Sequence, residues 1–126
     1  MEQVAVIGAS PKEDRYSNKA MRLLAEYKHH PIPVAPGHDT IEGEKVYENI
    51  SAIPDKLDTA TLYLGPKRQT DEIVDQIIAA APKRVIFNPG TENPQTQEKL
   101  KAAGISVVEA CTLVLLKTGQ YDTSGL

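Results

Sequence analysis

The sequence is poor in cysteine and in aromatic residues, and it contains no long apolar run. Cys111 is the only cysteine among 126 residues, so neither an internal disulfide nor a zinc-type cluster of cysteine and histidine can form. No stretch approaches the roughly 20 apolar residues of a membrane span. The N-terminus enters a strand-like segment without the charged start and apolar block of a signal peptide. These absences predict a soluble, cytoplasmic protein.

The sequence also lacks a large excess of charge of either sign. Fourteen basic and seventeen acidic residues give a net charge of −3, which disfavours a broad surface for nucleic acid. The length suits one domain with one core and excludes a catalytic domain joined to a separate cofactor domain. We therefore expect a single domain that binds neither nucleic acid nor membrane; the sequence names no protein partner.

What the sequence does contain is an alternation of short apolar runs and helical spacing. Continuous runs typical of strands buried on both faces occur at 4–7, 32–35, 61–64, 84–87 and 106–109. Helical stripes lie between them, and Asn93-Pro94 is typical of a helix start. This alternation predicts βαβ units, that is, a three-layer α/β domain with an open parallel sheet of about five strands, the first strand central.

Four segments fit this pattern less simply. Pro33 cannot donate to a strand ladder, so we expect its missing donor to face the edge of the sheet or to end the pairing. Residues 37–58 predict loops, a short edge strand near Lys45-Val46 and a helical turn at Ile50–Ile53. Lys83-Arg84 is interpreted as a solvated turn. We place the domain at 1–119 and expect the polar residues 120–126 to fray.

Ligands of open parallel sheets bind beyond the carboxyl ends of the strands. The segments predicted to lie there are Gly8-Ala9-Ser10, Pro36-Gly37-His38, Gly65-Pro66-Lys67 and Asn88-Pro89-Gly90-Thr91. Small residues allow the backbone to approach a ligand closely. Ordinary turns also use glycine, so the four segments together favour a site more than any one of them alone.

The first of these turns predicts an anion site. Gly8-Ala9-Ser10 follows the first strand, and the next helix can present N–H groups to a phosphate, with Lys12 and Arg15 nearby. The alternative is a plain glycine turn with Ser10 or Ser17 as the helix cap. A dinucleotide site is disfavoured, because there is no G-x-G-x-x-G pattern and no acidic residue at the end of the second strand.

The order of several motifs resembles the small stand-alone CoA-binding proteins. These motifs are residues 4–10, Arg15-Tyr16-Ser17, residues 33–36, Gly43 and Ile53-Pro54. The resemblance covers roughly residues 3 to 117. It implies a Rossmann-like domain shared with the CoA-binding part of the succinyl-CoA ligase α subunit, with coenzyme A or an acyl-CoA as the ligand.

The resemblance also implies which residues hold the ligand. By position, Gly8, Ala9 and Ser10 take the phosphates, with Arg15 and Ser17 in the following motif. The adenine and ribose lie along the segment after the second strand, Val34, Pro36 and Gly37 included. The pantetheine path is lined by Gly65, Pro66, Asn88, Pro89 and Gly90.

Two positions depart from the family pattern. His38 stands where the ligase-type domain often has a lysine, so a permanent charge beside the 3′-phosphate is replaced by a group that titrates near neutrality. Glu109-Ala110-Cys111 retains only the acid and the cysteine of an Asp-Arg-Cys-like segment. The ligase's phosphorylated histidine belongs to a second domain absent from this chain, so ligase activity does not carry over.

No pattern of catalytic or metal-binding residues compels an enzymatic function. We interpret Cys111 as a small buried hydrophobe, the alternative being a thiol near the thioester end of CoA. The leading hypothesis is a binding protein for CoA or acyl-CoA. The alternatives are a small enzyme that acts on a CoA thioester or nucleotide through Cys111 or His38, and an interaction module with a vestigial pocket.

Overall fold

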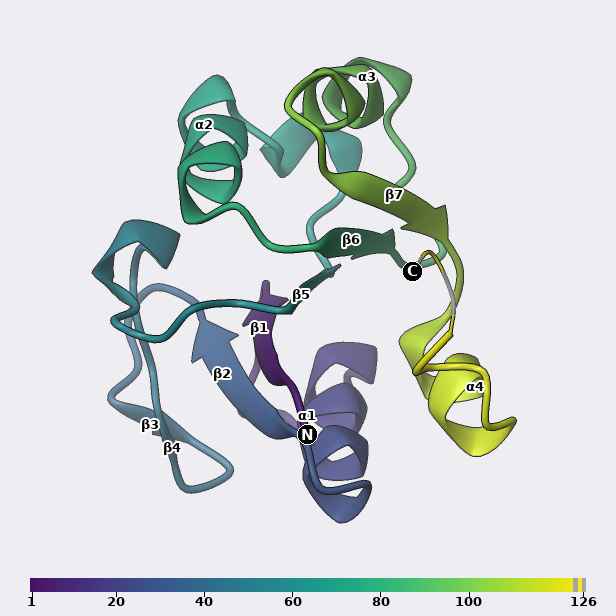
Figure 1. Cartoon of the computed structure of the whole chain (residues 1–126). Helices are drawn as coiled ribbons and strands as arrows, with labels where there is room; N and C mark the ends of the chain where they lie inside the picture. Colours follow the sequence, from purple (N-terminus) through teal and green to yellow (C-terminus); the bar gives the residue numbers. More distant parts are fainter. Residues whose placement is uncertain (124, 126) are drawn as a thin grey trace.

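Five parallel strands form the sheet at the centre of the molecule (Figure 1), in a computed structural model that describes residues 1–123 and 125. Their spatial order is β2 (His30–Val34), β1 (Gln3–Ile7), β5 (Thr59–Leu62), β6 (Arg84–Phe87) and β7 (Ser106–Glu109). All four neighbouring pairs are parallel, which confirms the predicted open sheet. The chain forms β2 on one side of β1 and then crosses to the other side for β5. The strand order therefore reverses between β1 and β5, where such sheets bind ligands.

Helices cover both faces of the sheet, as predicted for a three-layer domain. Helices α1 (Tyr16–Glu26) and α4 (Thr112–Lys117) lie on one face, and α2 (Asp71–Ala80) and α3 (Pro94–Ala102) lie on the other (Figure 1). Strand β1 divides its side chains between the two layers. Val4 and Val6 belong to the core cluster that contains residues of α1 and α4. Ala5 and Ile7 belong to the cluster that contains residues of α2 and α3.

Two details of the sheet differ from the sequence prediction. Strand β1 is interior, with partners on both sides, but the middle strand is β5. Strand β5 also begins two residues earlier than the apolar run at 61–64 indicates. The reason is that Thr59, at its start, is fully buried and accepts a hydrogen bond of 2.8 Å from Arg84 Nε. A polar residue with a buried partner does not stand out in an apolar pattern.

The prolines of β2 face the outer edge of the sheet. His30 donates its N–H to the Glu2 carbonyl, and Val34 accepts from Gly8 N–H, so these even-numbered positions pair with β1. Pro31 and Pro33 alternate with these positions, so their backbone nitrogen and carbonyl groups face away from β1. The carbonyl of Pro33 accepts a 3.0 Å hydrogen bond from Tyr47 N–H on that outer side. The expectation that the missing donor of Pro33 faces the edge is confirmed.

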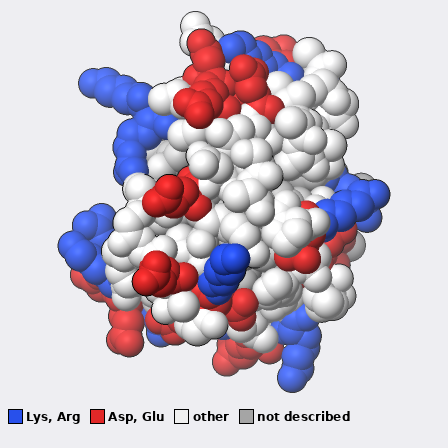
Figure 2. All heavy atoms as spheres, turned by 90° about the vertical axis from the view of Figure 1, so that its left-hand side faces the viewer, with Lys and Arg blue, Asp and Glu red and all other residues white. Residues whose placement is uncertain are grey.

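The segment between β2 and β5 forms short elements, as expected. β3 (Thr40–Ile41) and β4 (Glu44–Lys45) form an antiparallel hairpin, followed by the 3₁₀ turn η1 (Ile50–Ala52). This side of the molecule faces the viewer in Figure 2, where basic and acidic side chains are interspersed around a largely uncharged middle. Among the described residues, no helix has the length and apolarity needed to cross a bilayer.

The end of the chain corrects two sequence interpretations. Tyr121 is 2% exposed, so the expectation that residues 120–126 fray is wrong at this residue; residues 124 and 126 lie outside the described residues. Arg84 is fully buried and is not part of a solvated turn. Its guanidinium lies 4.3 Å from the centre of the Tyr121 ring and donates to the Tyr121 carbonyl at 2.6 Å. The Tyr121 ring therefore packs against the Arg84 guanidinium, and the Tyr121 carbonyl accepts a hydrogen bond from it.

Candidate functional site

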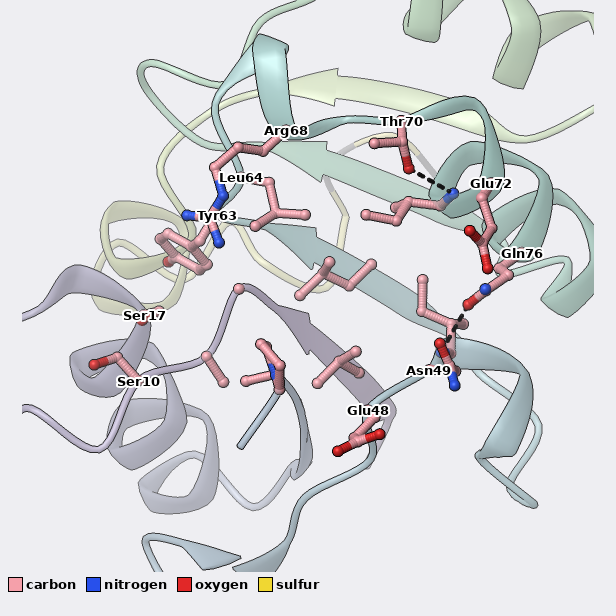
Figure 3. A pocket seen from close by; sticks show the side chains of 18 of the residues that line it. Ser10, Ser17, Glu48, Asn49, Tyr63, Leu64, Arg68, Thr70, Glu72 and Gln76 are labelled. Atoms are coloured by element: carbon pink, nitrogen blue, oxygen red, sulfur yellow. Dashed lines mark hydrogen bonds between the residues drawn. The ribbon is translucent and has the colours of Figure 1, made fainter. Parts of the chain in front are cut away.

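A cavity of about 710 Å³ opens at the carboxyl ends of β1, β2 and β5, where the strand order reverses (Figure 3). Its volume lies in the range of small-molecule sites, about 300–1,000 Å³. The β1–α1 segment, the end of β2, η1, the turn after β5 and the start of α2 all contribute to its wall. The lining residues are Ile7, Gly8, Ala9, Ser10, Arg15, Tyr16, Ser17, Val34, Ala35, Pro36, Glu48, Asn49, Ile50, Tyr63, Leu64, Arg68, Thr70, Glu72, Ile73 and Gln76.

Gly8 forms part of the floor of this cavity, and the position requires glycine for two reasons. Its φ of +89° lies in the left-handed region, which L side chains rarely adopt. A Cβ added there would also lie 3.1 Å from the backbone carbon and oxygen of Tyr63 and from Leu64 Cδ2. The turn can therefore follow β1 directly and remain in contact with the end of β5.

Two of the three N–H groups of this turn already have a partner within the protein. Gly8 and Ala9 both donate to the carbonyl of Val34, at 3.0 and 3.2 Å, and so tie β1 to β2. Ser10 does not cap the following helix, because its Oγ accepts from Lys12 N–H at 3.1 Å and closes the loop. The start of the helix that follows therefore becomes the main candidate for anion binding in this segment.

Helix α1 begins at the wall of the cavity, and no side chain caps its first turn. Arg15 occupies its N-cap position and has no acceptor to offer the N–H groups of the first turn. Arg15, Tyr16 and Ser17 all line the cavity. The helix dipole places partial positive charge at this end, and the Arg15 guanidinium adds a full charge.

The two ends of the cavity differ in charge. In Figure 3, Ser10 and Ser17 lie at one end, and the side chain of Arg68 extends toward that end from η2 (Pro66–Arg68). Glu48, Asn49, Glu72 and Gln76 lie at the opposite end. The arrangement offers positive charge and N–H donors to an anion at one end, and carboxylate and amide groups to uncharged polar groups at the other.

The acidic end is built by η1 and α2, which the sequence analysis did not associate with a site. Gln76 Oε1 accepts a 3.1 Å hydrogen bond from Ile50 N–H and so links the two elements. Thr70 caps α2 by accepting from Ile73 N–H at 3.3 Å. These residues come from the face of a helix and from a loop, whereas the sequence search was confined to turns that directly follow strands. A cap at Thr70 marks where α2 starts, but only the fold shows that this start faces β1.

A smaller chamber of about 230 Å³ adjoins the larger cavity. Its wall is formed by Tyr16, Tyr63, Asn88, Pro89, Cys111 and Leu113, and the two tyrosines also line the larger cavity. Asn88 is 2% exposed, and both ends of its amide are already bonded. Its Nδ2 donates to Thr61 Oγ1 at 2.7 Å and to the Leu62 carbonyl at 3.0 Å, and its Oδ1 accepts from Thr112 N–H at 2.9 Å.

The Tyr63 hydroxyl lies between the two cavities, and the neighbouring hydroxyls of Thr61 and Thr112 lower its pKa, against the larger effect of burial. The hydroxyl oxygen is buried and, among the described residues, has no partner within hydrogen-bonding geometry. Burial raises the pKa of Tyr63 to about 12, and the nearby Cys111 adds to this rise. The hydroxyl is therefore protonated at neutral pH and can act as a donor.

The structure brings only part of the predicted set together. The larger cavity collects seven of the residues expected to bind the ligand: Gly8, Ala9, Ser10, Arg15, Ser17, Val34 and Pro36. Two others, Asn88 and Pro89, line the smaller chamber. The remaining five lie outside the lining of both cavities: Gly37, His38, Gly65, Pro66 and Gly90. Gly65 lies at the N-cap of η2, and Gly90 N–H donates to the Glu92 carboxylate at 2.8 Å.

Comparison with known proteins agrees with this geometry. The α subunit of the ADP-forming acetate–CoA ligase I of Pyrococcus furiosus is 36% identical over 72 residues, which are 52% of this chain and 16% of that subunit. The chain thus spans only a small part of the length of this relative. The match confirms the resemblance to the CoA-binding part of such a ligase.

Solved structures match the chain over most of its length. The crystal structure of an uncharacterized protein has a TM-score of 0.88 and 38% identity, over 95% of this chain and 98% of that chain. A hypothetical protein from Pyrococcus horikoshii OT3 has a TM-score of 0.87 and 33% identity, over 93% of this chain and 82% of the other. The family model described as a CoA binding domain matches residues 2–117. Because that match covers nearly the whole chain, the protein belongs to the family of CoA-binding domains.

Proposed function

We propose that this protein is a CoA-binding or acyl-CoA-binding protein that holds its ligand in the larger cavity. The observation that carries the proposal is the start of helix α1, which has no side-chain cap and whose residues Arg15, Tyr16 and Ser17 line the cavity. An uncapped helix start with an adjacent guanidinium is suited to a phosphate. Membership of the CoA-binding family supports the same ligand.

The pyrophosphate lies, in this proposal, at the end of the cavity formed by Ser10, Ser17 and the start of α1. Arg15 and Arg68 supply charge there, and both side chains are exposed enough to move onto the ligand. A guanidinium can bond two phosphate oxygens at once, which a lysine ammonium does not do with the same geometry.

The adenosine occupies the opposite end. Val34 and Pro36 offer apolar contacts, as the family resemblance implies, while Glu48 and Asn49 can bond the ribose hydroxyls and the adenine amino group. His38 is exposed and lies just outside the lining, so any contact that it makes with a 3′-phosphate is a surface contact.

The pantetheine arm then follows the wall past Tyr63 and Leu64 toward Asn88 and Pro89. The two groups weighed as reactive residues of an enzyme lie apart along this path. Cys111 lines the smaller chamber, whereas His38 lines neither cavity. Binding is therefore the function for which the geometry offers direct support. The one free thiol fits the reducing cytoplasm, where we place the protein.

Two measurements test the proposal. Native mass spectrometry of freshly purified protein should show an adduct with the mass of CoA or of an acyl-CoA. Calorimetric titration with CoA should give saturable binding at one site per chain. Absence of binding at millimolar CoA would contradict the proposal, and binding of ADP with the same affinity as CoA would restrict it to a nucleotide site.

A further inference from the structure

We propose that the smaller chamber accepts the acyl group of a short-chain acyl-CoA, so that the protein binds the thioester more tightly than free CoA. The inference rests on the proposed function and deepens it. It concerns a cavity of about 230 Å³ that the adenosine and the pyrophosphate do not need.

The position of the chamber is the first argument. Tyr16 and Tyr63 line both the chamber and the larger cavity, so the two spaces adjoin at these rings. A pantetheine arm that passes Tyr63 and reaches Pro89 ends at the chamber. Whatever is bonded to the sulfur of the ligand is therefore directed into it.

The chemistry of the wall is the second argument. Pro89, Leu113 and the tyrosine rings present apolar surface, and Cys111 contributes a small side chain of weak polarity. The amide of Asn88 is already hydrogen-bonded to Thr61, Leu62 and Thr112, so it does not offer the chamber a free polar group. Such a wall suits an alkyl chain, and none of its lining residues carries a charged side chain.

The Tyr63 hydroxyl is the third argument. It is buried and protonated at neutral pH, and among the described residues it forms no hydrogen bond of ordinary geometry, although the hydroxyls of Thr61 and Thr112 are close enough to lower its pKa. An unpaired buried hydroxyl costs stability, and a carbonyl acceptor brought in by a ligand removes that cost. The thioester carbonyl of an acyl-CoA is such an acceptor and adjoins the sulfur. Free CoA has a thiol there and provides no carbonyl next to it.

The size of the chamber sets the length of the acyl group. At roughly 30 Å³ per water molecule in the liquid, it has the volume of about eight waters, which suits a few carbon atoms and not a fatty-acid chain. Each buried methylene should strengthen binding by about fourfold. The affinity should therefore rise from acetyl-CoA to butyryl-CoA, which has two more methylenes, by roughly fifteenfold and fall again for long chains.

Calorimetry with CoA, acetyl-CoA, butyryl-CoA and palmitoyl-CoA tests the inference in the wild-type protein and three variants. Leu113→Trp fills the chamber and should remove the preference for butyryl-CoA while CoA affinity stays within about twofold. Val114→Trp is the matched control on the next residue of α4, because Val114 is 54% exposed and lies outside the chamber lining. Tyr63→Phe keeps the ring and should weaken the acyl-CoAs by two- to tenfold more than it weakens CoA.

Cys111 provides a second readout without any substitution. Its thiol lines the chamber, so butyryl-CoA should slow its alkylation by iodoacetamide more than desulfo-CoA does, as followed by mass spectrometry of the protein. Equal affinity for CoA and butyryl-CoA, or identical behaviour of Leu113→Trp and Val114→Trp, would overturn the inference and leave the proposed function standing. Binding of none of these ligands would overturn both.

Discussion

At the amino ends of β1, β5 and β6, Arg84 lies fully buried among polar partners, whereas the carboxyl ends of β1 and β5 open into the larger cavity. Arg84 bonds Thr59 and the Tyr121 carbonyl and lies 3.5 Å from the Glu2 carboxylate, which also accepts from the Tyr121 hydroxyl at 3.0 Å. At the opposite edge, the start of α1 is uncapped and the Tyr63 hydroxyl has no described partner.

The difference shows how one sheet separates stability from binding. Polar groups that satisfy one another fix the fold, and removing one of them leaves the others buried and unpaired. Polar groups left open in a cavity cost stability and are retained where a ligand completes them. Substitutions at the amino edge should therefore change the free energy of unfolding, and substitutions at the carboxyl edge should change affinity.

The largest effect is expected at the amino edge. Arg84→Ala should lower the free energy of unfolding by about 3–5 kcal/mol, because it leaves the carboxylate of Glu2 without its cation and Thr59 without its donor. Urea denaturation measures the loss. Lys83→Ala is the neighbouring control, since its ion pair with Asp58 is largely exposed and should contribute less than about 1 kcal/mol. A similar loss in both variants would mean that the buried contacts of Arg84 stabilise the fold no more than the exposed ion pair of Lys83 does.

Gly8→Ala should lower stability by about 2–4 kcal/mol, since it adds a left-handed alanine and a close contact with the Tyr63 backbone. Gly37→Ala separates the two causes. Its φ of +78° imposes similar strain, but nothing lies within 4 Å of the added Cβ. It should therefore cost only about 1–2 kcal/mol in the same denaturation experiment. Equal losses would mean that the contact with β5 is unimportant.

Arg15→Ala should weaken CoA by ten- to a hundredfold, the equivalent of the about 1.5–3 kcal/mol of a charge-assisted contact. Its free energy of unfolding should change by less than about 0.5 kcal/mol, because the side chain is exposed. Lys12→Ala removes a positive charge from the same loop at a position outside the cavity lining, and calorimetry should find CoA affinity nearly unchanged. Comparable losses for the two variants would indicate attraction by net charge alone.

The two buried tyrosines allow a direct comparison of the edges. Tyr121→Phe removes a donor to the Glu2 carboxylate and should cost about 1.5 kcal/mol at pH 7. Tyr63→Phe removes a hydroxyl with no described partner and should change stability by less than about 0.5 kcal/mol. If denaturation experiments show a larger loss of free energy of unfolding for Tyr63→Phe than for Tyr121→Phe, the assignment of stability to the amino edge and of binding to the carboxyl edge is wrong.

The raised pKa values of Tyr63 and Tyr121 predict that the free energy of unfolding falls at alkaline pH. Burial raises the pKa of Tyr63 to about 12 and also raises the pKa of Tyr121, where the nearby Glu2 adds to the effect. Because each folded-state pKa lies above the unfolded value, the contribution is complete below pH 10 and is lost as the pH rises through the folded-state value. Tyr63→Phe should therefore flatten the decrease in stability between pH 10 and pH 12.

The smallest effect is expected at His38, which is exposed and lies outside the lining of both cavities. If it reaches the 3′-phosphate, His38→Lys should raise the preference for CoA over dephospho-CoA and His38→Ala should lower it, each by up to about fivefold. Calorimetry with both ligands decides whether His38 belongs to the site.

Much of the fold follows from the sequence because buried parallel strands are continuous apolar runs. Residues 4–7 and 84–87 are apolar or paired on both faces, and Asn93-Pro94 marks the start of α3 by local capping. Arg84 and Tyr121 were misjudged because neither has a local signal: both contact residues that are distant in the sequence, including each other, 37 residues apart. A pattern of residues along the chain reflects contacts between neighbours in the sequence and gives no information on contacts between distant residues.

The site is predicted in part for a related reason. The turns after β1 and β2 supply Gly8 and Pro36, as topology requires, but Glu48 and Gln76 reach the cavity from elements that the strand-end rule does not include. Arg68 lies one residue beyond the segment predicted after β5. The donors of Gly8 and Ala9 were also assigned to the ligand, because the sequence cannot show that Val34 accepts both. A glycine turn after a strand indicates where an anion can bind and not which N–H groups are free.

The outward-facing prolines of β2 have a consequence for the behaviour of the protein at high concentration. An exposed sheet edge is a template on which a strand from another molecule can pair and begin an aggregate. Along β2 the outward positions include Pro31 and Pro33, which have no N–H to offer, and Tyr47 already occupies the carbonyl of Pro33. Replacing both prolines by valine would restore two donors on this edge, and the resulting protein should form β-rich oligomers at concentrations where the native chain stays dispersed.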